Sequence, residues 1–406
     1  MITIKNKTDC CGCEACATAC PKKCINMKAD YEGFLYPEVD KTLCVNCGLC
    51  ERVCPVQNNV QRYDIQKAYA MQHKNKELRI KSSSGGAFSA LAHNVIDNGG
   101  IVYGVIFDED MNVVHTSAFT RQELVLMRGS KYVQSRIGNV YAQVKADLKS
   151  DRKVLFTGTP CQVEGLLNYL GTAPQNLITA DLVCHGVPSP KVWKKYLKDI
   201  ESKYSSKITG YSFRSKKTGF HDFGTEIIFE NGHTRYTHDK GEEKDFMHLA
   251  FFHEICSRPS CHDCRFKTAA RRSDFTLFDC WHVSEFDGSV EDDLGTSAIL
   301  LHTEKAVDVF EQVKQEIWCK EVDIRRVIEL DGNNVEYSMK PNSMRKEFFE
   351  ELDGMSCDEL QEKYLKEKSK APIVVVIKAV LRKIGIFELI KRTVYKLTKD
   401  SYKGRL

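Results

Sequence analysis

Two matching cysteine runs lie in the first sixty residues, and they constrain the fold of this chain more than any other feature. Each run has the form C-x-x-C-x-x-C-x-x-x-C-P; the first ends at Pro21 and the second at Pro55. The eight cysteines are Cys10, Cys13, Cys16, Cys20, Cys44, Cys47, Cys50 and Cys54. Three cysteines spaced three residues apart let one tight loop present three thiolates to a single 4Fe-4S cubane.

The fourth cysteine of each run cannot bend back to the cubane that its own run holds. This is the spacing of bacterial two-cluster ferredoxins, in which the fourth cysteine ligates the other cluster. The expected ligand sets are Cys10, Cys13 and Cys16 with Cys54, and Cys44, Cys47 and Cys50 with Cys20. A zinc ribbon also uses C-x-x-C pairs, but two matching runs with a proline after each favour the clusters. We predict that residues 1–60 form a domain that transfers single electrons.

Composition indicates an ordinary globular protein with enough chain for two or three domains. The 406 residues are 42% hydrophobic and 28% charged, which is typical of folded proteins. The 18 cysteines cluster like metal ligands, and this favours the reducing cytoplasm. The N-terminus has no apolar signal segment. The sequence contains no run of about twenty apolar residues, so we predict no membrane-spanning helix.

After a polar linker at residues 57–64, the apolar pattern predicts alternating strands and helices. The predicted strands are 67–71, 101–107, 113–118, 154–157 and 178–183, and the predicted helices are 87–98, 139–149 and 162–170. Alternation of this kind predicts an α/β sheet covered by helices. Residues 208–236 predict an antiparallel hairpin instead, with Asn231-Gly232 at a turn. We therefore expect an α/β (α+β) fold with a mixed sheet, preceded by a short hairpin at 31–39 that shields the clusters.

Two loops have the composition of anion sites. Ser82-Ser83-Ser84-Gly85-Gly86 directly precedes a predicted helix. Gly158-Thr159-Pro160-Cys161 follows a predicted strand, with Pro160 suited to a first helical turn. Free backbone N–H groups at a helix start attract phosphate, and a simple helix cap is the alternative. Neither loop matches G-x-G-x-x-G or G-x-x-x-x-G-K-[ST], so the sequence does not support a Rossmann or P-loop assignment.

A second group of cysteines is spread over the later chain and comprises Cys161, Cys184, Cys261 and Cys264. These thiols could hold a third 4Fe-4S cluster if the fold brings them together, which spacing alone does not establish. Cys256 and Cys280 compete as fourth ligands. A zinc site built from Cys256, Cys261, Cys264 and Cys280 is the structural alternative. We expect Cys11, Cys24, Cys319 and Cys357 to be plain buried or surface thiols.

A series of motifs in one order resembles a known family. The motifs are SSSGGAFSAL, KYVQSRIG, FTGTPCQVEGL, DLVCHGVPS, FRSKKTGF, RPSCHDCRFK, RRSDFTLFDCW and LGTSAILLHT. Over residues 1–345 the chain resembles the beta subunit of coenzyme F420-reducing hydrogenases and dehydrogenases, with a fused N-terminal two-cluster ferredoxin domain. The resemblance divides the later chain into a family N-terminal region at 65–150, a family C-terminal region at 151–345 and a helical basic tail at 346–406.

The resemblance implies an FAD-binding domain with its own 4Fe-4S cluster beside the flavin. By motif, Cys161, Cys184, Cys261 and Cys264 become the ligands of that third cluster. The implied flavin contacts are Ser83, Ser84, Gly85, Gly86, Lys131, Tyr132, Val133 and Gln134. The second loop adds Gly158 and Pro160 as candidates. The chain departs from the family pattern at Cys280, where the family has an aromatic residue, so we expect Cys280 to pack as a small apolar thiol.

These features together predict an iron-sulfur flavoprotein oxidoreductase of the cytoplasm. FAD would exchange a hydride with a small organic donor or acceptor, and the clusters would pass single electrons to or from a carrier such as a soluble ferredoxin. The alternatives are an electron-carrier or adaptor module without a substrate site, and a membrane-surface reductase of polysaccharide biosynthesis. We assign no catalytic base and expect His185 to be a hydrogen-bonded structural histidine. Nucleic-acid binding is not expected, because no binding motif is present.

The C-terminal residues form a separate basic segment. Residues 369–406 carry ten Lys or Arg against Glu388 and Asp400. Apolar residues at helical spacing predict two amphipathic stretches within 371–406. The segment either makes peripheral contact with the inner face of an anionic membrane or docks on its own domain. We expect Lys267, Arg271 and Arg272 on a solvated face unless they meet an anionic substrate.

Overall fold

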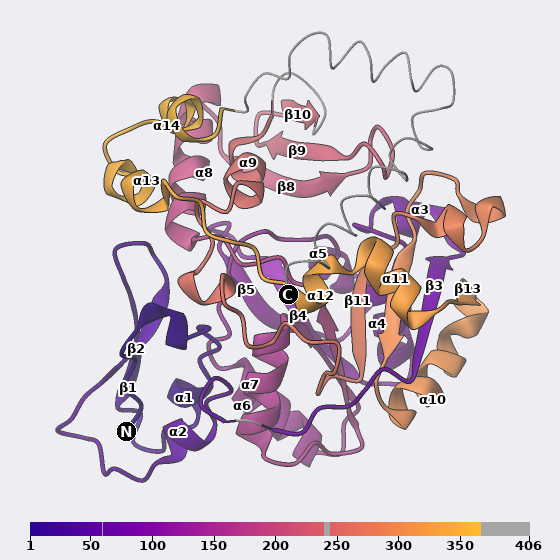
Figure 1. Cartoon of the computed structure of the whole chain (residues 1–406), viewed down its shortest axis with the longest axis horizontal. Coiled ribbons are helices and arrows are strands. Elements are labelled where there is room, and N and C mark those ends of the chain that lie inside the picture. The colour runs from indigo at the N-terminus through magenta and orange to yellow at the C-terminus, as the bar shows by residue number, and fades with distance from the viewer. Residues whose placement is uncertain (59, 239–243, 367–406) are drawn as a thin grey trace, which may run out of the picture. The chain divides into compact units, whose positions relative to one another are not determined.

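The computed structural model describes residues 1–58, 60–238 and 244–366 (Figure 1). By its internal contacts the chain divides between Gln361 and Glu362. The predicted amphipathic segment 371–406 lies outside the described residues. Within the described ranges, no helix combines the length and apolar character that crossing a bilayer requires.

The N-terminal part holds one hairpin and two single-turn helices that follow the cysteine loops. Strands β1 (Ile25–Ala29) and β2 (Leu35–Val39) pair antiparallel. Helices α1 (Ala15–Thr18) and α2 (Leu49–Arg52) each begin after a residue with left-handed backbone, Glu14 at φ 60° and Gly48 at φ 73°. The hairpin predicted at 31–39 is displaced, because residues 30–34 form its turn and its first strand lies upstream. Gly33 at φ 88° allows that turn.

An eight-stranded mixed sheet forms the centre of the rest of the unit, as the alternating pattern predicted. Its order is β13-β3-β12-β11-β7-β6-β4-β5. The strands are β3 (Lys67–His73), β4 (Ile101–Phe107), β5 (Val113–Ala118), β6 (Val154–Gly158), β7 (Leu177–Leu182), β11 (Phe275–Asp279), β12 (Ser297–Leu301) and β13 (Ile317–Glu321). Strands β4, β6, β7 and β11 run parallel, and the pairs at both sides are antiparallel.

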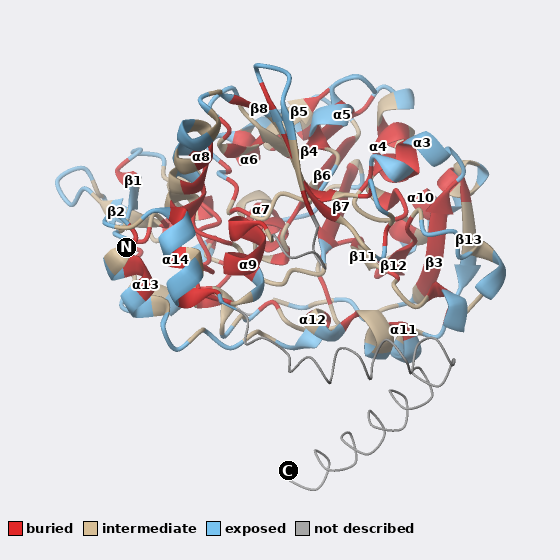
Figure 2. Cartoon of the chain, turned by 90° about the horizontal axis from the view of Figure 1, so that it is seen from above, coloured by how far each residue is buried: buried red, intermediate tan, exposed pale blue. Residues whose placement is uncertain are grey.

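Two helices cover each face of this sheet, because its central strands are apolar on both sides. Helices α4 (Ala87–Asp97) and α10 (Glu304–Val313) pack on the face that carries Val102, Leu155 and Ile178. Helices α6 (Val140–Lys149) and α7 (Pro160–Leu170) pack on the opposite face. Alternate residues of each strand therefore enter two different cores. Figure 2 shows β3, β6 and α4 as largely buried.

The segment predicted as a hairpin forms a separate three-stranded sheet rather than joining the large one. Its order is β10-β9-β8, with β8 (Ile208–Ser215), β9 (Gly224–Phe229) and β10 (Thr234–His238). The turn between β9 and β10 contains Asn231 and Gly232, and Gly232 has φ 82°. The remaining helices are α3 (Lys76–Ile80), α5 (Leu124–Met127), α8 (Pro190–Tyr204), α9 (Phe246–Phe252), α11 (Ile324–Asp331), α12 (Asn333–Glu336), α13 (Arg345–Glu351) and α14 (Cys357–Tyr364).

The first cysteine loop packs directly on the large α/β part. A Cβ atom on Gly165 of α7 would lie 3.1 Å from the Cβ and Sγ atoms of Cys13, so the loop approaches the helix at a position without a side chain. The buried carboxylate of Glu14 accepts hydrogen bonds from the backbone N–H groups of Ile137 and Gly138 at 3.0 and 3.3 Å. The N-terminal part is thus held against α6 and α7 by packing and by satisfied buried polar groups.

A buried ion pair joins the turn of the N-terminal hairpin to α13. Removal of this pair tests how much it stabilises the contact between the N-terminal part and the rest of the fold. Both oxygens of Glu32 accept from the guanidinium of Arg345, at 2.6 and 2.7 Å, and the two side chains are 3% and 14% exposed. Arg345→Met leaves Glu32 buried without its partner, so we expect the free energy of unfolding to fall by about 3 kcal/mol. Urea unfolding of anaerobically purified protein measures this change.

The Glu32→Gln, Arg345→Met double variant is the control for this prediction. It removes the stranded charge, so its loss of stability should be clearly smaller than the sum of the two single losses. A single-variant loss within about 0.5 kcal/mol of zero would show that the pair contributes nothing to docking.

Candidate redox site

The candidate site lies at the carboxyl ends of the parallel strands. Strand β6 ends at Gly158, β7 at Leu182 and β11 at Asp279. The residues that follow include Cys161, Cys184 and Trp281, so three separate segments deliver reactive or aromatic side chains to one edge of the sheet. This edge is where open α/β sheets bind ligands.

Five cysteines line one pocket at this edge. Four of them are the predicted ligands Cys161, Cys184, Cys261 and Cys264, and the fifth is Cys11. Cys161 lies in the first turn of α7, where Pro160 occupies the first helical position as predicted. Burial raises the pKa of Cys184 to about 12 and that of Cys264 to about 11. Burial thus favours the neutral thiols, and a bound metal centre is the kind of positive charge that would stabilise four thiolates.

Cations surround this pocket, contrary to the expectation of a solvated face. Lys267 and Arg271 both line it. The ammonium group of Lys267 donates to the backbone carbonyls of Cys184 and Asn334. Arg271 is 3% exposed and donates to the carbonyl of Phe266. These positive charges would offset the negative charge of thiolates in the pocket.

The two competing ligands lie elsewhere in the fold. Cys256 is fully buried, and its backbone carbonyl accepts from the N–H of Ser189. Cys280 packs in an apolar cluster with Ala68, Val283 and Leu300. Neither lines the cysteine pocket. The zinc alternative required Cys256, Cys261, Cys264 and Cys280 together, and the fold does not bring them together.

The spacing predicts two crossed groups for the eight cysteines of the N-terminal runs, and members of each group lie together. Cys20 lines a small pocket with Cys44, Cys47 and Cys50. Cys54 packs in one apolar cluster with Cys13 and in another with Cys16. Cys47 is exposed, whereas Cys50 and Cys13 are buried. The second group is therefore partly open to solvent, and Cys13 of the first lies against α7.

Two cysteines that we expected to be plain thiols lie among these groups. Cys11 is 8% exposed and lines the pocket of Cys161. Cys24 lies with its Sγ atom 3.4 Å from that of Cys20. Nothing in the spacing of the runs distinguishes Cys11 or Cys24 from ordinary core residues, because both positions depend on how the loops pack.

A larger cleft of about 480 Å³ adjoins the cysteine pocket. Seven of the ten predicted flavin contacts line it: Ser83, Ser84, Gly86, Lys131, Tyr132, Val133 and Gly158. Cys184, His185, Gly186, Val187 and Asn334 line both the cleft and the cysteine pocket. A ligand in the cleft would therefore share a wall with whatever the four cysteines hold.

The other three predicted contacts do not line the cleft. Gly85 is packed against backbone, since a Cβ there would lie 2.4 Å from the carbonyl oxygen of Met71. Gln134 faces the N-terminal part and donates to the carbonyl of Cys11 at 3.0 Å. Pro160 lines the cysteine pocket instead. Sequence alone does not separate these residues from their neighbours, because adjacent residues of a loop point in different directions.

The serine loop opens onto the cleft through its backbone rather than its hydroxyl groups. The hydroxyl of Ser83 accepts from the backbone N–H of Ser130 at 2.7 Å, and that of Ser84 donates to the carbonyl of Thr296 at 2.6 Å. Helix α4 begins after Gly86, at φ 92°, and no side chain caps its first turn. The N–H groups of that turn are therefore the donors left for an anion.

Lys131 and Arg128 are cations of the cleft that have no acidic partner among the described residues. The ammonium group of Lys131 donates to the carbonyls of Met127, Arg128 and Gly129, at 3.4, 3.2 and 3.2 Å, and lies 5.6 Å from the centre of the Phe107 ring. Burial lowers the pKa of Lys131 to about 7. A bound anion would reverse this shift by favouring the charged form.

Aromatic side chains and one ion pair form another wall of the cleft. The guanidinium of Arg214 donates to the carboxylate of Asp279 at 2.5 Å and lies 4.9 Å from the centre of the Trp281 ring. Tyr132 stacks on Phe251 with ring centres 4.6 Å apart. The sequence analysis did not single out Arg214 or Phe251, although Arg214 stands within the FRSKKTGF motif.

His185 lies on the wall that the two cavities share. Its Nδ1 atom is 3.1 Å from the amide nitrogen of Asn334, its Nε2 atom contacts the carboxylate of Glu254, and its ring meets that of Phe251 edge-on at 4.7 Å. The histidine is therefore hydrogen-bonded at Nδ1 and close to a carboxylate at Nε2, in a position next to the cleft.

Both cavities fit the cofactors that the motifs imply. Four cysteine sulfurs around one pocket are the donor set of a 4Fe-4S cluster. The adjoining cleft offers an uncapped helix start, a lysine without an acidic partner and stacked aromatic rings. These groups suit a dinucleotide with an anionic diphosphate and a flat ring system.

Comparison with known proteins finds two family models. Residues 151–326 match the model for the C terminus of the beta subunit of coenzyme F420 hydrogenase/dehydrogenase. Residues 9–58 match the model described as 4Fe-4S dicluster domain. Both matches agree with the resemblance that the motifs carry.

Curated relatives and one solved structure extend this result. The coenzyme F420-dependent sulfite reductase of Methanocaldococcus jannaschii is 25% identical over 329 residues, which cover 77% of this chain and 46% of that protein. An NADH-quinone oxidoreductase subunit I of Geobacter metallireducens is 41% identical over 56 residues, which cover 13% of this chain and 43% of that protein. The chain thus spans less than half the length of either relative.

A chain of the F420-reducing [NiFe] hydrogenase complex from Methanosarcina barkeri aligns with a TM-score of 0.44 and 16% identity, over 72% of this chain and 94% of that chain. The family-model matches assign two regions of the chain. Residues 151–326 form a domain of the kind found at the C terminus of the coenzyme F420 hydrogenase/dehydrogenase beta subunit, and residues 9–58 form a 4Fe-4S dicluster domain.

Proposed function

We propose that this chain is an iron-sulfur flavoprotein oxidoreductase that couples two-electron chemistry at FAD to one-electron transfer through three 4Fe-4S clusters. The observation that supports this most is the wall shared by the cysteine pocket and the large cleft, which includes Cys184 and His185. A flavin and a cluster on the two sides of that wall would be near neighbours. FAD supplies exchange of a hydride with an organic substrate, and a cluster supplies transfer of one electron at a time.

The proposed ligands form three sets. They are Cys10, Cys13, Cys16 and Cys54 for the first cluster, Cys20, Cys44, Cys47 and Cys50 for the second, and Cys161, Cys184, Cys261 and Cys264 for the third. The first set lies against α7, which carries Cys161. This arrangement supports a path for electrons from the second cluster through the first and the third to the cleft.

The residues of the cleft have separate roles in this proposal. The first turn of α4 and the ammonium group of Lys131 bind the diphosphate of FAD. Tyr132 and Phe251 exclude water from the ring system by their stacked apolar faces. The Arg214–Asp279 pair orients the Arg214 guanidinium into the cleft, where it can meet an electron-rich part of the cofactor or the substrate.

His185 is proposed to hold a proton at the shared wall. When Nδ1 accepts from the amide of Asn334, the proton of the neutral ring is on Nε2 and points to Glu254. The carboxylate keeps that tautomer in place. The sequence predicted a hydrogen-bonded structural histidine, and that prediction is compatible with this role. A structural role would use the same two contacts, with Asn334 and Glu254.

A soluble one-electron carrier such as a ferredoxin is the proposed partner of the second cluster. Cys47 is exposed, and the neighbouring Leu43 and Val45 are 54% and 59% exposed. Apolar side chains around an exposed ligand suit a transient protein contact. The organic substrate is proposed as a small hydride donor or acceptor of the deazaflavin or nicotinamide kind, and the location as the cytoplasm.

Iron content tests the number of clusters. We expect anaerobically purified protein to contain about twelve irons, four for each of three cubanes, together with one released FAD. Cys261→Ala removes a ligand of the third set, so iron should fall toward about eight. Iron and acid-labile sulfide analysis measures both values.

Two buried cysteines outside the ligand sets supply matched controls. Cys256→Ala and Cys280→Ala should keep the iron content of the unaltered protein, since neither residue lines the cysteine pocket. Eight irons and no flavin in the unaltered protein would contradict the proposed function. An equal loss of iron in Cys280→Ala would contradict the assignment of ligands.

The pH dependence of FAD binding tests Lys131. The pKa of Lys131 is lowered to about 7 in the empty cleft and should rise when the diphosphate binds. Affinity should therefore be constant below pH 7 and fall as the pH rises above it, because only the complex retains the proton. Lys131→Met should weaken binding at pH 6 by about tenfold and remove the decline.

Fluorescence titration of flavin-depleted protein measures these affinities. Lys131→Arg retains the charge, so its binding should stay strong and lose the dependence near pH 7. Lys145→Met is the control, because Lys145 lies over the Tyr169 ring of α7, away from the cleft. The same pH profile in Lys131→Met as in the unaltered protein would exclude Lys131 as the titrating group.

The basic segment 371–406 carries a separate proposal, of peripheral contact with an anionic membrane. Deletion of these residues should abolish binding to vesicles that contain phosphatidylglycerol while leaving the iron content unchanged. Sedimentation with vesicles measures the binding, with phosphatidylcholine vesicles as the control. Full-length protein that stays in the supernatant with both kinds of vesicle would refute membrane contact.

A further inference from the structure

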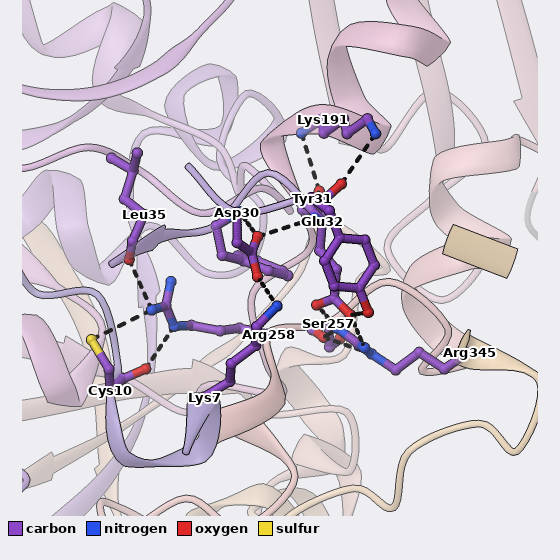
Figure 3. A network of polar contacts seen from close by, with 12 residues as sticks. Lys7, Cys10, Asp30, Tyr31, Glu32, Leu35, Lys191, Ser257, Arg258 and Arg345 are labelled. Carbon is purple, nitrogen blue, oxygen red and sulfur yellow. Dashed lines mark hydrogen bonds and ion pairs between the residues drawn. The ribbon is translucent and has the colours of Figure 1, made fainter. Parts of the chain in front are cut away.

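Arg258 is a fully buried cation between the N-terminal part and the cysteine pocket (Figure 3). Its Nε atom donates to the backbone carbonyl of Cys10 at 2.8 Å, and one terminal nitrogen donates to the carbonyl of Leu35 at 3.0 Å and lies 3.5 Å from the Sγ atom of Cys10. The other terminal nitrogen donates to the side-chain oxygen of Gln134 at 2.9 Å. All of these partners are neutral groups, and the sulfur of Cys10 is the one that becomes negative when it binds a metal as a thiolate.

No carboxylate pairs with Arg258 among the residues that the structure describes. Other largely buried guanidinium groups of this fold do have acidic partners, as Arg345 has Glu32 and Arg214 has Asp279. A buried cation is costly unless a negative charge lies close to it. Arg258 therefore needs a source of negative charge that ordinary acidic residues do not provide.

Cysteine thiolates are that source. Burial lowers the pKa of Arg258, but the charges of Cys10, Tyr36, Cys11 and Cys261 outweigh this effect and raise it. The backbone carbonyl of Arg258 also accepts from the N–H of Cys261 at 2.9 Å. The residue is thus tied to Cys10, in the first ligand set, and to Cys261, in the third.

The surrounding residues form a cradle for this one side chain. The guanidinium carbon lies 4.4 Å from the centre of the Tyr36 ring and 5.3 Å from that of Phe34. A Cβ on Gly12 would lie 2.7 Å from a terminal nitrogen of Arg258, and Gly12 has φ 71°. Only glycine allows both the backbone conformation and the close approach, so the first cysteine loop is shaped around this cation.

We propose that Arg258 is a counter-cation shared by the first and third clusters, which raises the reduction potential of both. This inference rests on the proposed function, since it assumes clusters at both cysteine sets. Reduction adds one negative charge to a cluster, and a fixed positive charge stabilises the reduced form more than the oxidised form. Arg258 is a positioning residue in this role, because it acts on the clusters and meets no substrate.

The second cluster provides an internal reference for this effect. Its ligand Cys47 is exposed and its ligand Cys44 half-buried, and the hydrogen bonds of Arg258 go to Cys10, Leu35 and Gln134 rather than to that loop. Water screens charges at an exposed site strongly. Loss of the Arg258 charge should therefore move two potentials and leave the third where it was.

Redox titration of anaerobically purified full-length protein, followed by electron paramagnetic resonance, tests the proposal. In Arg258→Gln the reduction equilibrium constants of the first and third clusters should fall by about tenfold, which is about 59 mV for a one-electron couple. The second cluster should keep its potential. Arg258→Lys retains the charge, so the potentials of the first and third clusters should shift by less than about half as many millivolts as in Arg258→Gln.

Arg345→Met is the matched control. It removes another guanidinium that docks the same N-terminal part, through Glu32 and the carbonyl of Ser257, without contact with a cluster ligand. All three potentials should stay unchanged in it. An equal shift in Arg345→Met would show that docking rather than local charge sets the potentials and would overturn the proposal.

The remaining outcomes separate this proposal from the proposed function. Unchanged potentials in Arg258→Gln at full iron content, or equal shifts in all three clusters, would overturn the role of Arg258. If Arg258→Gln does not retain iron, Arg258→Lys becomes the test of the proposal. A tenfold fall in the reduction equilibrium constants of the first and third clusters in Arg258→Lys would overturn the proposal. Unaltered protein without a third cluster would refute the proposed function, and the shift of the first cluster would still report on Arg258.

Discussion

The contact between the first cysteine loop and α7 is the constraint on which the rest of this arrangement depends. Gly165 lets Cys13 approach helix α7, which begins at Pro160, and Glu14 satisfies two backbone N–H groups beside it. One helix therefore carries Cys161 of the cysteine pocket in its first turn and supports the N-terminal runs one turn later. Close packing of this kind fixes distances between redox centres in a way that a flexible tether cannot.

The parallel strands determine where the chemistry can occur. Strands β6, β7 and β11 all end at the same edge, so the loops after them meet although they are far apart in sequence. One loop supplies Cys161, another Cys184 and His185, and a third the aromatic wall at Trp281. The adjoining cavities at this edge explain how one-electron and two-electron centres can be neighbours in a single chain.

Buried charge gives the same region its electrostatic character. Lys267 and Arg271 line the cysteine pocket, Arg258 lies between the cysteine sets, and Lys131 stands in the cleft without an acidic partner. Arg271 lies 3.8 Å from the buried carboxylate of Asp181, whereas Lys267, Arg258 and Lys131 have no such partner among the described residues. A buried cation without a carboxylate is costly, so the protein part of the site is complementary to anionic cofactors such as thiolate clusters and a diphosphate.

The sequence by itself predicted the spacing of the N-terminal cysteine ligands, five of the eight strands of the mixed sheet, and seven of the residues that line the cleft. These features are local: ligand spacing, apolar periodicity and helix starts are written in neighbouring residues. Tertiary structure alone decided that Cys161, Cys184, Cys261 and Cys264 meet while Cys256 and Cys280 do not. It also decided that Gln134 and Arg258 turn toward the first cysteine loop, because the direction of a loop side chain depends on what the distant chain packs against it.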